Sequence, residues 1–332
     1  MKNIYIDKQD FYEWLVGLTD GDGCFLINIQ KNSLCFTYKI SLSTNNLQLL
    51  YYIKSELKIG SVTIEKNRKM ASFRVRDSQK LNDIILPIFE KYPLFTKKYY
   101  DFIYFKEALN FKLKSQNNKD DVKEFLILAK KKRRINETPL ISPRIYKNLT
   151  PDQVDSFFIN LDKFYDSKSC SILLDLIKTY KLNLVFPKFW VIGFIEAEGS
   201  FFFVKKDANR IIHSFGITQK EDPLILAVIK SIFHIPTKLQ FKCFQYSNNI
   251  MKNEKLEFKL NQYYSLETTN SRAIENIIHY FSGKHKNKTN MKGFKSLEYR
   301  IWARSYVKYK GNFDKLLKIQ KLLKNLREKL KE

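Results

Sequence analysis

The sequence lacks a long apolar run and contains few cysteines. No stretch approaches the about 18 uncharged apolar residues of a membrane span, so we expect a soluble protein that does not cross a membrane. The four cysteines include no Cys-x-x-Cys pair, which argues against a zinc knuckle and against a disulfide framework. We interpret them as reduced thiols in the core or at the surface.

Acidic residues are scarce relative to basic ones. The chain of 332 residues has 59 Lys and Arg against 34 Asp and Glu, a formal net charge of +25. This excess exceeds what solubility requires and attracts polyanions, so nucleic acid is the leading predicted partner. A ribosomal component and a membrane-surface binder are the alternatives. Both are disfavoured because the charge is spread along the chain, not gathered in a tail or on one helix face.

The N-terminal stretch lacks the features of a targeting segment. Residues 1–14 contain acidic residues and no arginine, unlike a secretory signal or a transit peptide. If the protein works in an organelle, we expect it to be made there, or its presequence to be missing from this sequence. The abundance of Lys, Asn, Ile, Phe and Tyr is typical of AT-rich codons. We therefore predict a mitochondrial or other organellar location.

A duplicated motif is the most specific feature of the chain. Residues 14–27 read WLVGLTDGDGCFLI, and residues 190–203 read WVIGFIEAEGSFFF. After each copy come two alternating segments, a helical stretch, a hairpin and a further helix, in the same order. Each copy is therefore predicted to be an α-β-β-α-β-β-α unit. The matching pairs are Trp14/Trp190, Gly17/Gly193, Asp20/Glu196, Asp22/Glu198, Gly23/Gly199 and Phe25/Phe201.

Alternation along the predicted strands indicates a sheet with two different faces. Phe73 and Val75 point one way, while Arg74 and Arg76 point the other. Four such strands in each copy predict an antiparallel sheet with helices on one face and an open, functional second face. A merely solvated second face is the alternative.

The predicted fold is α+β, with two repeats related by a pseudo-twofold axis. Each repeat is a saddle-like, four-stranded antiparallel sheet covered by helices, and the two motif helices pack at the centre. We expect three parts: a first repeat over residues 1–115, a structured helical linker over 116–185 and a second repeat over 186–332. The linker contains the run KKKRR at 130–134, which is read as a phosphate-contacting or solvated helix end, with a nuclear-import signal as the alternative.

Small residues within the two motifs predict close helix packing. Gly17 and Gly21 are four residues apart on the first motif helix, and Gly193 and Ala197 have the same spacing on the second. Such a stripe lets two helix backbones approach closely. A glycine inside a helix costs up to about 1 kcal/mol relative to alanine, so its duplication suggests that the approach is needed. We infer that the two motif helices pack against each other.

This packing would place Asp22 and Glu198 side by side at two helix C-terminal ends. Two carboxylates repel each other there, and the helix dipoles add to the repulsion. Divalent cations would remove it, and Mg²⁺ is typically held by one or two carboxylates together with substrate phosphates. Two such ions can stabilise the attacking and leaving oxygens of a phosphodiester. The combination predicts a metal-dependent nuclease.

The duplicated motif resembles that of the two-repeat, single-chain LAGLIDADG homing endonucleases. LVGLTDGDG and VIGFIEAEG stand where the family has its name-giving nonapeptide, and the similarity covers nearly the whole chain. The resemblance implies Asp22 and Glu198 as metal ligands, with the carbonyls of Gly21 and Ala197 as further candidates. For the earlier acids of the motif, Asp20 and Glu196, a structural role at the helix end is favoured over direct chemistry.

The resemblance also implies catalytic residues outside the motif. The family places a basic residue of each repeat near the metals, and the repeat alignment selects Lys98 and Lys295. They would polarise the attacking water or stabilise the developing phosphorane charge. Ordinary surface lysines are the alternative. Gln219 resembles a polar family residue that positions water, and its counterpart in the first repeat, near Thr44, is not evident from the sequence.

Specificity is expected to come from the open sheet faces. Each sheet can cover about one helical turn of the major groove, so the two together predict an asymmetric double-stranded DNA target of roughly 20 base pairs. Phe202 and Val204 share this face, where contact with thymine methyl groups and packing against sugars alone are the two alternatives. The candidate base readers are Asn28, Gln30, Asn32, Lys39, Ser41, Arg74, Arg76, Lys206, Ser214, Thr218, Gln240, Lys242 and Ser265.

The predicted activity is hydrolysis of one phosphodiester on each strand by a monomer, leaving short 3′ overhangs. Mg²⁺ is the expected cofactor, and Ca²⁺ is expected to support binding without cleavage. The alternatives are an intron RNA maturase of the same fold and a DNA-binding protein that does not cut. HNH-type and GIY-YIG-type nucleases are disfavoured, because the four histidines form no metal-ligand pair.

Overall fold

The computed structural model describes most of the chain. The described residues are 7–30, 33–114, 141–220, 222–247, 258–282 and 289–329. The basic run at 130–134 and the candidate base reader Asn32 lie outside them, and the side chain of Gln30 is not described.

The first repeat has the predicted order of elements, and we call residues 8–114 repeat one. Two helical segments follow its hairpin, and the first runs from Ser78 to Lys91 and includes the π-helical turn Leu81–Ile85. The main elements are α1 (Lys8–Asp22), β1 (Gly23–Gln30), β2 (Ser33–Ser43), α2 (Leu47–Leu57), β3 (Ser61–Glu65), β4 (Met70–Val75), α3 (Ser78–Lys80), α4 (Leu86–Lys91) and α5 (Lys98–Lys114).

The same order returns in residues 188–329, which we call repeat two. Its elements are α10 (Lys188–Glu198), β5 (Gly199–Asp207), β6 (Arg210–Gln219), α11 (Pro223–Ile232), β7 (Gln240–Ser247), β8 (Phe258–Thr268), α12 (Ser271–Phe281), α13 (Phe294–Tyr309) and the additional helix α14 (Phe313–Lys329). Between the repeats lie α7 (Pro143–Tyr146), α8 (Pro151–Ser167) and α9 (Cys170–Thr179).

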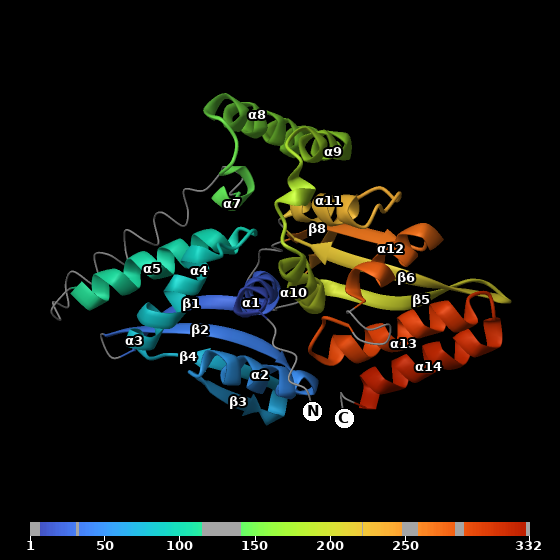
Figure 1. The fold of residues 1–332 in the computed structure, drawn as a ribbon, viewed down its shortest axis with the longest axis horizontal. Helices are drawn as coiled ribbons and strands as arrows, with labels where there is room; N and C mark the ends of the chain where they lie inside the picture. The colour runs from blue at the N-terminus through green and yellow to red at the C-terminus, as the bar shows by residue number, and fades with distance from the viewer. Residues whose placement is uncertain are drawn as a thin grey trace.

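Both sheets are antiparallel and have equivalent strand orders. The orders are β1-β2-β4-β3 and β5-β6-β8-β7, and the sheets lie on either side of the central pair α1 and α10 (Figure 1). The register pairs Phe25 with Tyr38 and Phe201 with Phe215, so one face of each sheet presents buried aromatic rings to its helices. The predicted α+β fold with two related repeats is confirmed.

The two motif helices cross with their backbones in contact. A Cβ added to Gly17 would lie 2.1 Å from the carbonyl oxygen of Trp190, and one added to Gly193 would lie 2.1 Å from that of Trp14. No side chain larger than hydrogen fits at either position without a shift of the backbone. The predicted small-residue packing is therefore confirmed, and it is reciprocal.

The linker is anchored to repeat one by a buried ion pair. The Nη2 of Arg144, in α7, pairs with Oε1 of Glu13, in α1, while its Nη1 donates to the carbonyl of Pro93 at 3.0 Å. The guanidinium also lies over the ring of Phe95 at 4.5 Å. Further on, α8 begins with the predicted cap at Thr150, which forms a capping box with Gln153.

Helix α14 covers the free edge of the second sheet. Gln320 and Arg327 donate to the carbonyls of Phe203 and Phe201 on the edge strand β5, at 3.2 and 2.9 Å. Arg327 also pairs through Nε with the buried carboxylate of Glu298 in α13. Covering an edge in this way satisfies its carbonyls and blocks pairing with another strand.

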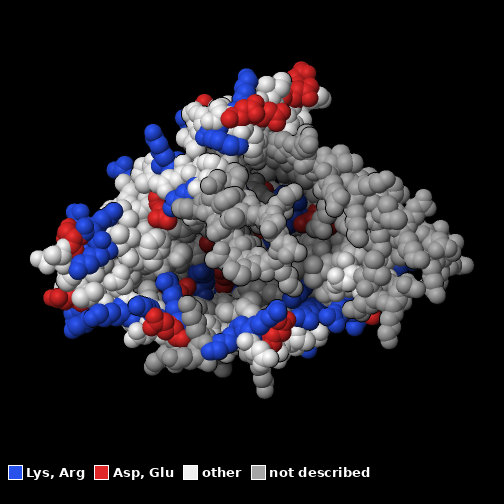
Figure 2. Space-filling view, turned by 180° about the vertical axis from the view of Figure 1, so that it is seen from behind, with Lys and Arg blue, Asp and Glu red and all other residues white. Residues whose placement is uncertain are grey.

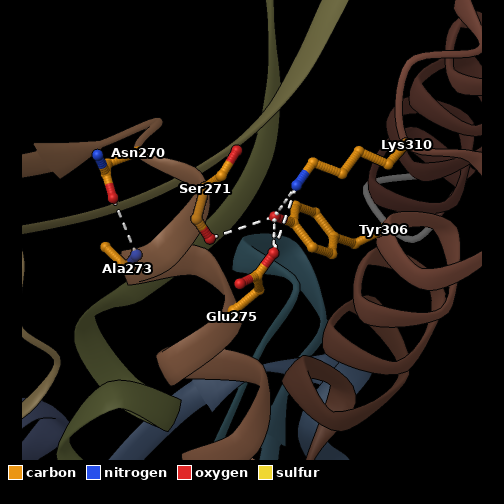
Figure 3. A network of polar contacts seen from close by, with 6 residues as sticks. All are labelled: Asn270, Ser271, Ala273, Glu275, Tyr306 and Lys310. Carbon is orange, nitrogen blue, oxygen red and sulfur yellow. Dashed lines mark hydrogen bonds and ion pairs between the residues drawn. The ribbon is translucent and has the colours of Figure 1, made fainter.

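A polar network joins α12 to α13 at the outside of repeat two. The hydroxyl of Tyr306 lies 2.9 Å from Oε1 of Glu275 and 3.2 Å from the carbonyl of Ser271, and Lys310 donates to Tyr306 at 2.7 Å (Figure 3). At the start of α12, Asn270 accepts from the backbone N–H of Ala273. This network fixes the two helices to each other at the end of α13 remote from Lys295.

Charge is distributed unevenly over the surface. Seen from the side opposite to Figure 1, Lys and Arg side chains follow the lower margin of the molecule (Figure 2). The largest group of Asp and Glu side chains lies instead at the α8–α9 end, at the top of the same view. No helix in the described part of the chain is long and apolar enough to cross a bilayer.

Candidate active site

The last acids of the two motifs lie together at the centre of the molecule. Asp22 ends α1 and Glu198 ends α10. A Cβ added to Gly21 would lie 2.3 Å from the Cβ of Ala197 and 3.5 Å from Oε1 of Glu198. The close helix crossing thus brings the C-terminal end of each motif helix beside the acid of the other.

Burial makes the ionised forms of both carboxyls unfavourable. It raises the pKa of Asp22, with the ammonium groups of Lys98 and Lys295 acting in the opposite direction. It also raises the pKa of Glu198, and the neighbouring charge of Asp22 raises it further. Two carboxyls that disfavour each other's charge in this way form a site that a cation would stabilise.

Both predicted lysines reach this site. The Nζ of Lys98 donates to the carbonyls of Thr19, at 3.2 Å, and of Gly21. The Nζ of Lys295 donates to the carbonyl of Gly199 at 2.6 Å. Burial lowers the pKa of Lys295. Neither lysine is therefore an ordinary surface side chain.

Gln219 also lies in the site, and its position is asymmetric. Its side chain hydrogen-bonds to Glu198. The strand registers identify its counterpart, because Gly23 pairs with Ile40 as Gly199 pairs with Ile217, and two residues further along stand Leu42 and Gln219. The first repeat therefore has an apolar side chain where the second has an amide. Leu42 lines a cavity of about 620 Å³ together with Asp22 and Lys295.

The earlier acids of the motifs are structural. Asp20 is buried and accepts hydrogen bonds from the backbone N–H groups of Phe95 and Thr96, at 2.9 and 3.1 Å, just before α5. Glu196 does the same before α13, where Lys292 and Gly293 donate to its Oε1. These bonds leave neither carboxylate free for chemistry, which is the role that we favoured from the sequence.

Two tryptophans connect the repeats through these acids, and sequence reasoning missed them. Trp14 of α1 donates through Nε1 to Glu196 of α10 at 2.8 Å, and Trp190 of α10 donates to Asp20 of α1 at 2.7 Å. The matching positions of the two tryptophans were the available signal. Each repeat thereby completes a buried acid of the other.

The donor set fits a divalent cation that also binds substrate. Among the described residues there is no group of three or more His, Cys, Asp or Glu side chains that could hold a metal ion. Two carboxylates, aided by the carbonyl of Ala197 or Gly21, make an incomplete set of hard oxygen ligands. Such a set suits Mg²⁺, which keeps several ligands for water or phosphate.

Most candidate base readers lie on the open faces of the two sheets. The exposed or half-buried ones, placed there by alternation and register, are Asn28, Lys39, Ser41, Arg74, Arg76, Thr218, Gln240 and Lys242. Lys206 is exposed but lies at the register shift between Lys205 and Asp207, so the strand pairing assigns it to neither face. Arg74 is held by an ion pair with Glu65 at 2.7 Å.

Two candidates on the same face are shielded from solvent. Ser214 and Ser265 are each 1% exposed, and Ser214 donates its hydroxyl to the carbonyl of Thr268. Their burial argues against direct contact with bases, so we remove both from the set of base readers. Alternation had identified their face but not the depth at which neighbouring side chains cover them.

Comparison with known proteins identifies the family. The family model described as "LAGLIDADG endonuclease" matches residues 15–109. A Schizosaccharomyces pombe protein named "Probable intron-encoded endonuclease Cox1-I1b" is 33% identical over 337 residues, which cover 97% of this chain and 70% of that protein. This chain belongs to the LAGLIDADG endonuclease family. The resemblance noted in the sequence is confirmed.

Further relatives and solved structures agree with this family. A Kluyveromyces lactis "Probable intron-encoded endonuclease aI3" is 28% identical over 89% of this chain and 65% of its own length. The DNA complex of the LAGLIDADG homing endonuclease I-GzeII has a TM-score of 0.60 and 21% identity, covering 93% of this chain and 96% of that one. I-SmaMI bound to uncleaved DNA with calcium ions has a TM-score of 0.58 and 19% identity, with coverages of 93% and 97%. At these identities the structural likeness shows the fold.

Proposed function

We propose that this LAGLIDADG protein is a homing endonuclease that binds a long, asymmetric double-stranded DNA target and hydrolyses one phosphodiester on each strand. The observation that carries the proposal is the central group of Asp22, Glu198, Lys98 and Lys295, drawn from both repeats. The supporting features are the two open sheet faces and the net charge of +25. The relatives named as intron-encoded endonucleases and the neighbours solved with DNA point to the same activity.

Each central residue has a role that its position supports. Asp22 and Glu198 would hold divalent metal, for which we propose Mg²⁺, with the carbonyls of Gly21 and Ala197 as further oxygen donors. When bound, the metal supplies Lewis acidity and lowers the pKa of coordinated water. Lys98 and Lys295 present ammonium groups beside the same carboxylates, where they would stabilise the charge that develops at phosphorus. Gln219 would orient a water molecule next to Glu198.

The finer features of the proposal concern the target and the setting. Two sheets side by side support a site of roughly 20 base pairs, read by a monomer, with short 3′ overhangs after cleavage. We propose three parts, 1–115, 116–185 and 186–332, of which the acidic α8–α9 end of the middle part would stay away from DNA. A Saccharomyces cerevisiae relative named "Uncharacterized mitochondrial protein RF1", 31% identical over 68% of this chain, supports expression in an organelle.

Selection from a randomised library of about 22 base pairs tests the proposal. The library is incubated with Mg²⁺ to score cleavage and with Ca²⁺ to score binding alone. A single enriched sequence, cut on both strands with a short 3′ stagger, is the expected result. Enrichment in Ca²⁺ without any cutting in Mg²⁺ would contradict nuclease activity and favour a regulator. Enrichment of neither kind, with tight binding to the structured host intron RNA, would favour a maturase.

A further inference from the structure

The first turn of α5, the helix that carries Lys98, is hydrogen-bonded by side chains of both repeats. Phe95 and Thr96 donate their backbone N–H groups to Asp20, of repeat one, at 2.9 and 3.1 Å. The next N–H, of Lys97, donates to Oδ1 of Asp222, of repeat two, at 3.1 Å. Three successive donors are thus shared between a carboxylate of the same repeat and a carboxylate of the opposite one.

The helix that carries Lys295 begins in the equivalent way. Lys292 and Gly293 donate their N–H groups to Glu196, of repeat two, the first at 2.8 Å. The next N–H, of Phe294, donates to Oδ1 of Asn46, of repeat one, at 2.8 Å. We call a hydrogen bond from a side chain of one repeat to the first turn of the lysine-bearing helix of the other a crossed bond. Such a bond is present on both sides of the pseudo-twofold axis.

Asp222 and Asn46 make these contacts in place of a hydrogen bond to their own helices. Asp222 directly precedes α11 and Asn46 directly precedes α2, the N-cap position at which Asp and Asn normally accept a hydrogen bond from their own helix. Neither makes such a bond. Asn270, at the same position before α12, does cap its own helix (Figure 3). Asp222 and Asn46 instead direct their side-chain oxygens to the first turn of a lysine-bearing helix of the opposite repeat.

Each crossed bond ends one residue before a lysine of the site. Lys97 precedes Lys98, and Phe294 precedes Lys295. The bond therefore fixes the first turn from which the lysine projects toward the carboxylates. Displacement of a reacting group by about 1 Å can slow a reaction by up to about a hundredfold. Small movements of these helix starts are therefore expected to matter for the chemistry.

The two crossed bonds differ in charge. Burial raises the pKa of the Asp222 carboxyl to about 7, and the charge of Asp20 acts in the same direction. Asn46 is neutral at every pH. The start of α5 thus lies beside two acids, whereas the start of α13 lies beside one acid and one amide.

We propose that Asp222 and Asn46 are positioning residues that act across the pseudo-twofold axis: Asp222 of repeat two sets the place of Lys98 in repeat one, and Asn46 of repeat one sets that of Lys295 in repeat two. The proposal rests on the proposed nuclease function for its consequence in catalysis. Each lysine is in place only when the opposite repeat is docked against its helix, so that an isolated or displaced repeat is inactive.

Strand-resolved cleavage tests this proposal. The selected duplex carries a different fluorophore on each strand, and nicking of each strand is followed with Mg²⁺ for Asp222→Ala and Asn46→Ala. We expect each variant to slow one strand by about tenfold or more and the other strand much less, with the affected strand opposite in the two variants. Asp222→Asn keeps the acceptor oxygen and should restore most of the rate.

A matched control separates positioning from loss of a helix cap. Asn270→Ala removes an ordinary cap of α12, far from the site, and should lower stability without favouring either strand. DNA affinity measured in Ca²⁺ should be unchanged in all four variants. Equal slowing of both strands by Asp222→Ala and by Asn46→Ala, or no slowing by either, would overturn the proposal.

Amide hydrogen exchange provides a readout that does not require cleavage. In Asp222→Ala the amides of Lys97 and Lys98 should exchange faster, with those at the start of α13 unchanged, and Asn46→Ala should give the reverse. Unchanged exchange at both helix starts would overturn the proposal even for an active enzyme. If the wild-type protein cuts no DNA, the proposed function fails, and the exchange pattern alone decides whether the crossed bonds position the lysines.

Discussion

The two repeats share their packing and differ in their polar residues. Gly17 and Gly193 make the same contact with the opposite helix, and Trp14 and Trp190 make the same crossed hydrogen bond. In contrast, Gln219 faces Glu198 where the first repeat has Leu42. The helix packing and the hydrogen bonds between the repeats are thus duplicated, while the polar groups beside the central acids are not.

Additional contacts increase this difference at the edges of the site. Arg144 of the linker pairs with Glu13 of α1, whereas the equivalent position of α10 is the apolar Phe189. On the other side, Arg327 of α14 holds Glu298, one turn after Lys295. The fold therefore needs twofold symmetry at the helix interface, whereas the two reaction centres are free to diverge. Changes at symmetric positions should therefore have equal effects, and changes at the divergent positions unequal ones.

The largest effect is expected at the helix crossing. Gly17→Ala and Gly193→Ala each place a methyl group 2.1 Å from a backbone oxygen, so each should lower the free energy of unfolding by about 3 kcal/mol. Chemical denaturation of both variants measures the change. Gly311→Ala is the control, because a Cβ there meets nothing within 4 Å and only the positive φ of 84° is unfavourable, at about 1–2 kcal/mol. A clear difference in the free energy of unfolding between Gly17→Ala and Gly193→Ala would show that the interface is not energetically symmetric.

The crossed tryptophan bonds should give the next largest effect. Trp14→Phe and Trp190→Phe each remove a donor from a buried carboxylate, which should lower the free energy of unfolding by about 1–3 kcal/mol. Thermal or denaturant unfolding measures both. Trp302→Phe is the matched control, because its Nε1 donates to the neutral carbonyl of Phe202 at 3.0 Å. A loss in Trp302→Phe as large as in the other two would show that indole volume, not the crossed bond, matters.

Substitutions at the divergent positions Gln219 and Leu42 should change the cleavage rate of one DNA strand more than that of the other. Gln219→Leu removes the amide beside Glu198, and we expect it to slow cleavage of one strand by about tenfold, equivalent to about 1.4 kcal/mol of barrier. Leu42→Gln adds an amide to the other half and should shift the strand ratio in the opposite direction. Dual-label cleavage assays measure this ratio. Equal effects of Gln219→Leu on both strands would mean that the halves share one water-positioning group.

The pH dependence of stability should give the smallest effect. The folded-state pKa values of Asp22 and Glu198 are raised, so the unfolded chain loses these protons at lower pH than the folded protein does. Without metal, their unfavourable contribution is therefore absent below the unfolded pKa values of about 4, grows as the pH rises from these to the folded pKa values, and is constant above them. Asp22→Asn should raise the melting temperature by about 2–4 °C at pH 8 and by less at pH 5.

Thermal unfolding in EDTA at the two pH values measures this difference. Glu107→Gln, at an exposed position of α5, is the control for removal of one negative charge. Saturating Mg²⁺ should reduce the advantage of the Asp22 variant. A melting temperature of Asp22→Asn below that of the wild type at pH 8 would show that the two carboxyls do not repel each other in the folded protein.

The sequence was sufficient to predict the duplicated elements but not the contacts that one repeat makes with the other. Spacing in the two motifs was enough to predict the helix crossing through Gly17 and Gly193, and strand alternation was enough to predict the open faces. The equivalence of Leu42 and Gln219 follows only from the register of the paired strands, which the structure gives. Sequence alignment of the repeats could not supply it, because the connections between strand and helix differ in length.

Contacts between distant segments could not be predicted from spacing. Asn46 and Phe294 lie 248 residues apart, and the N-cap pattern of Asn46 predicts a bond to its own helix. Arg327 comes from a helix that lies beyond the duplicated unit. For Ser265, alternation predicted the face of the sheet correctly but not its burial, because burial depends on the neighbouring side chains that cover it.

Strand-resolved cleavage of the selected target by Asp22→Asn and Glu198→Gln tests whether the two central carboxylates hold the metal. We expect each substitution to abolish Mg²⁺-dependent cutting while leaving binding in Ca²⁺ intact, because the reaction needs the metal that both carboxylates would hold. Undiminished cleavage of both strands by both variants would contradict the assignment of the central acids and, with it, the proposed chemistry of the site.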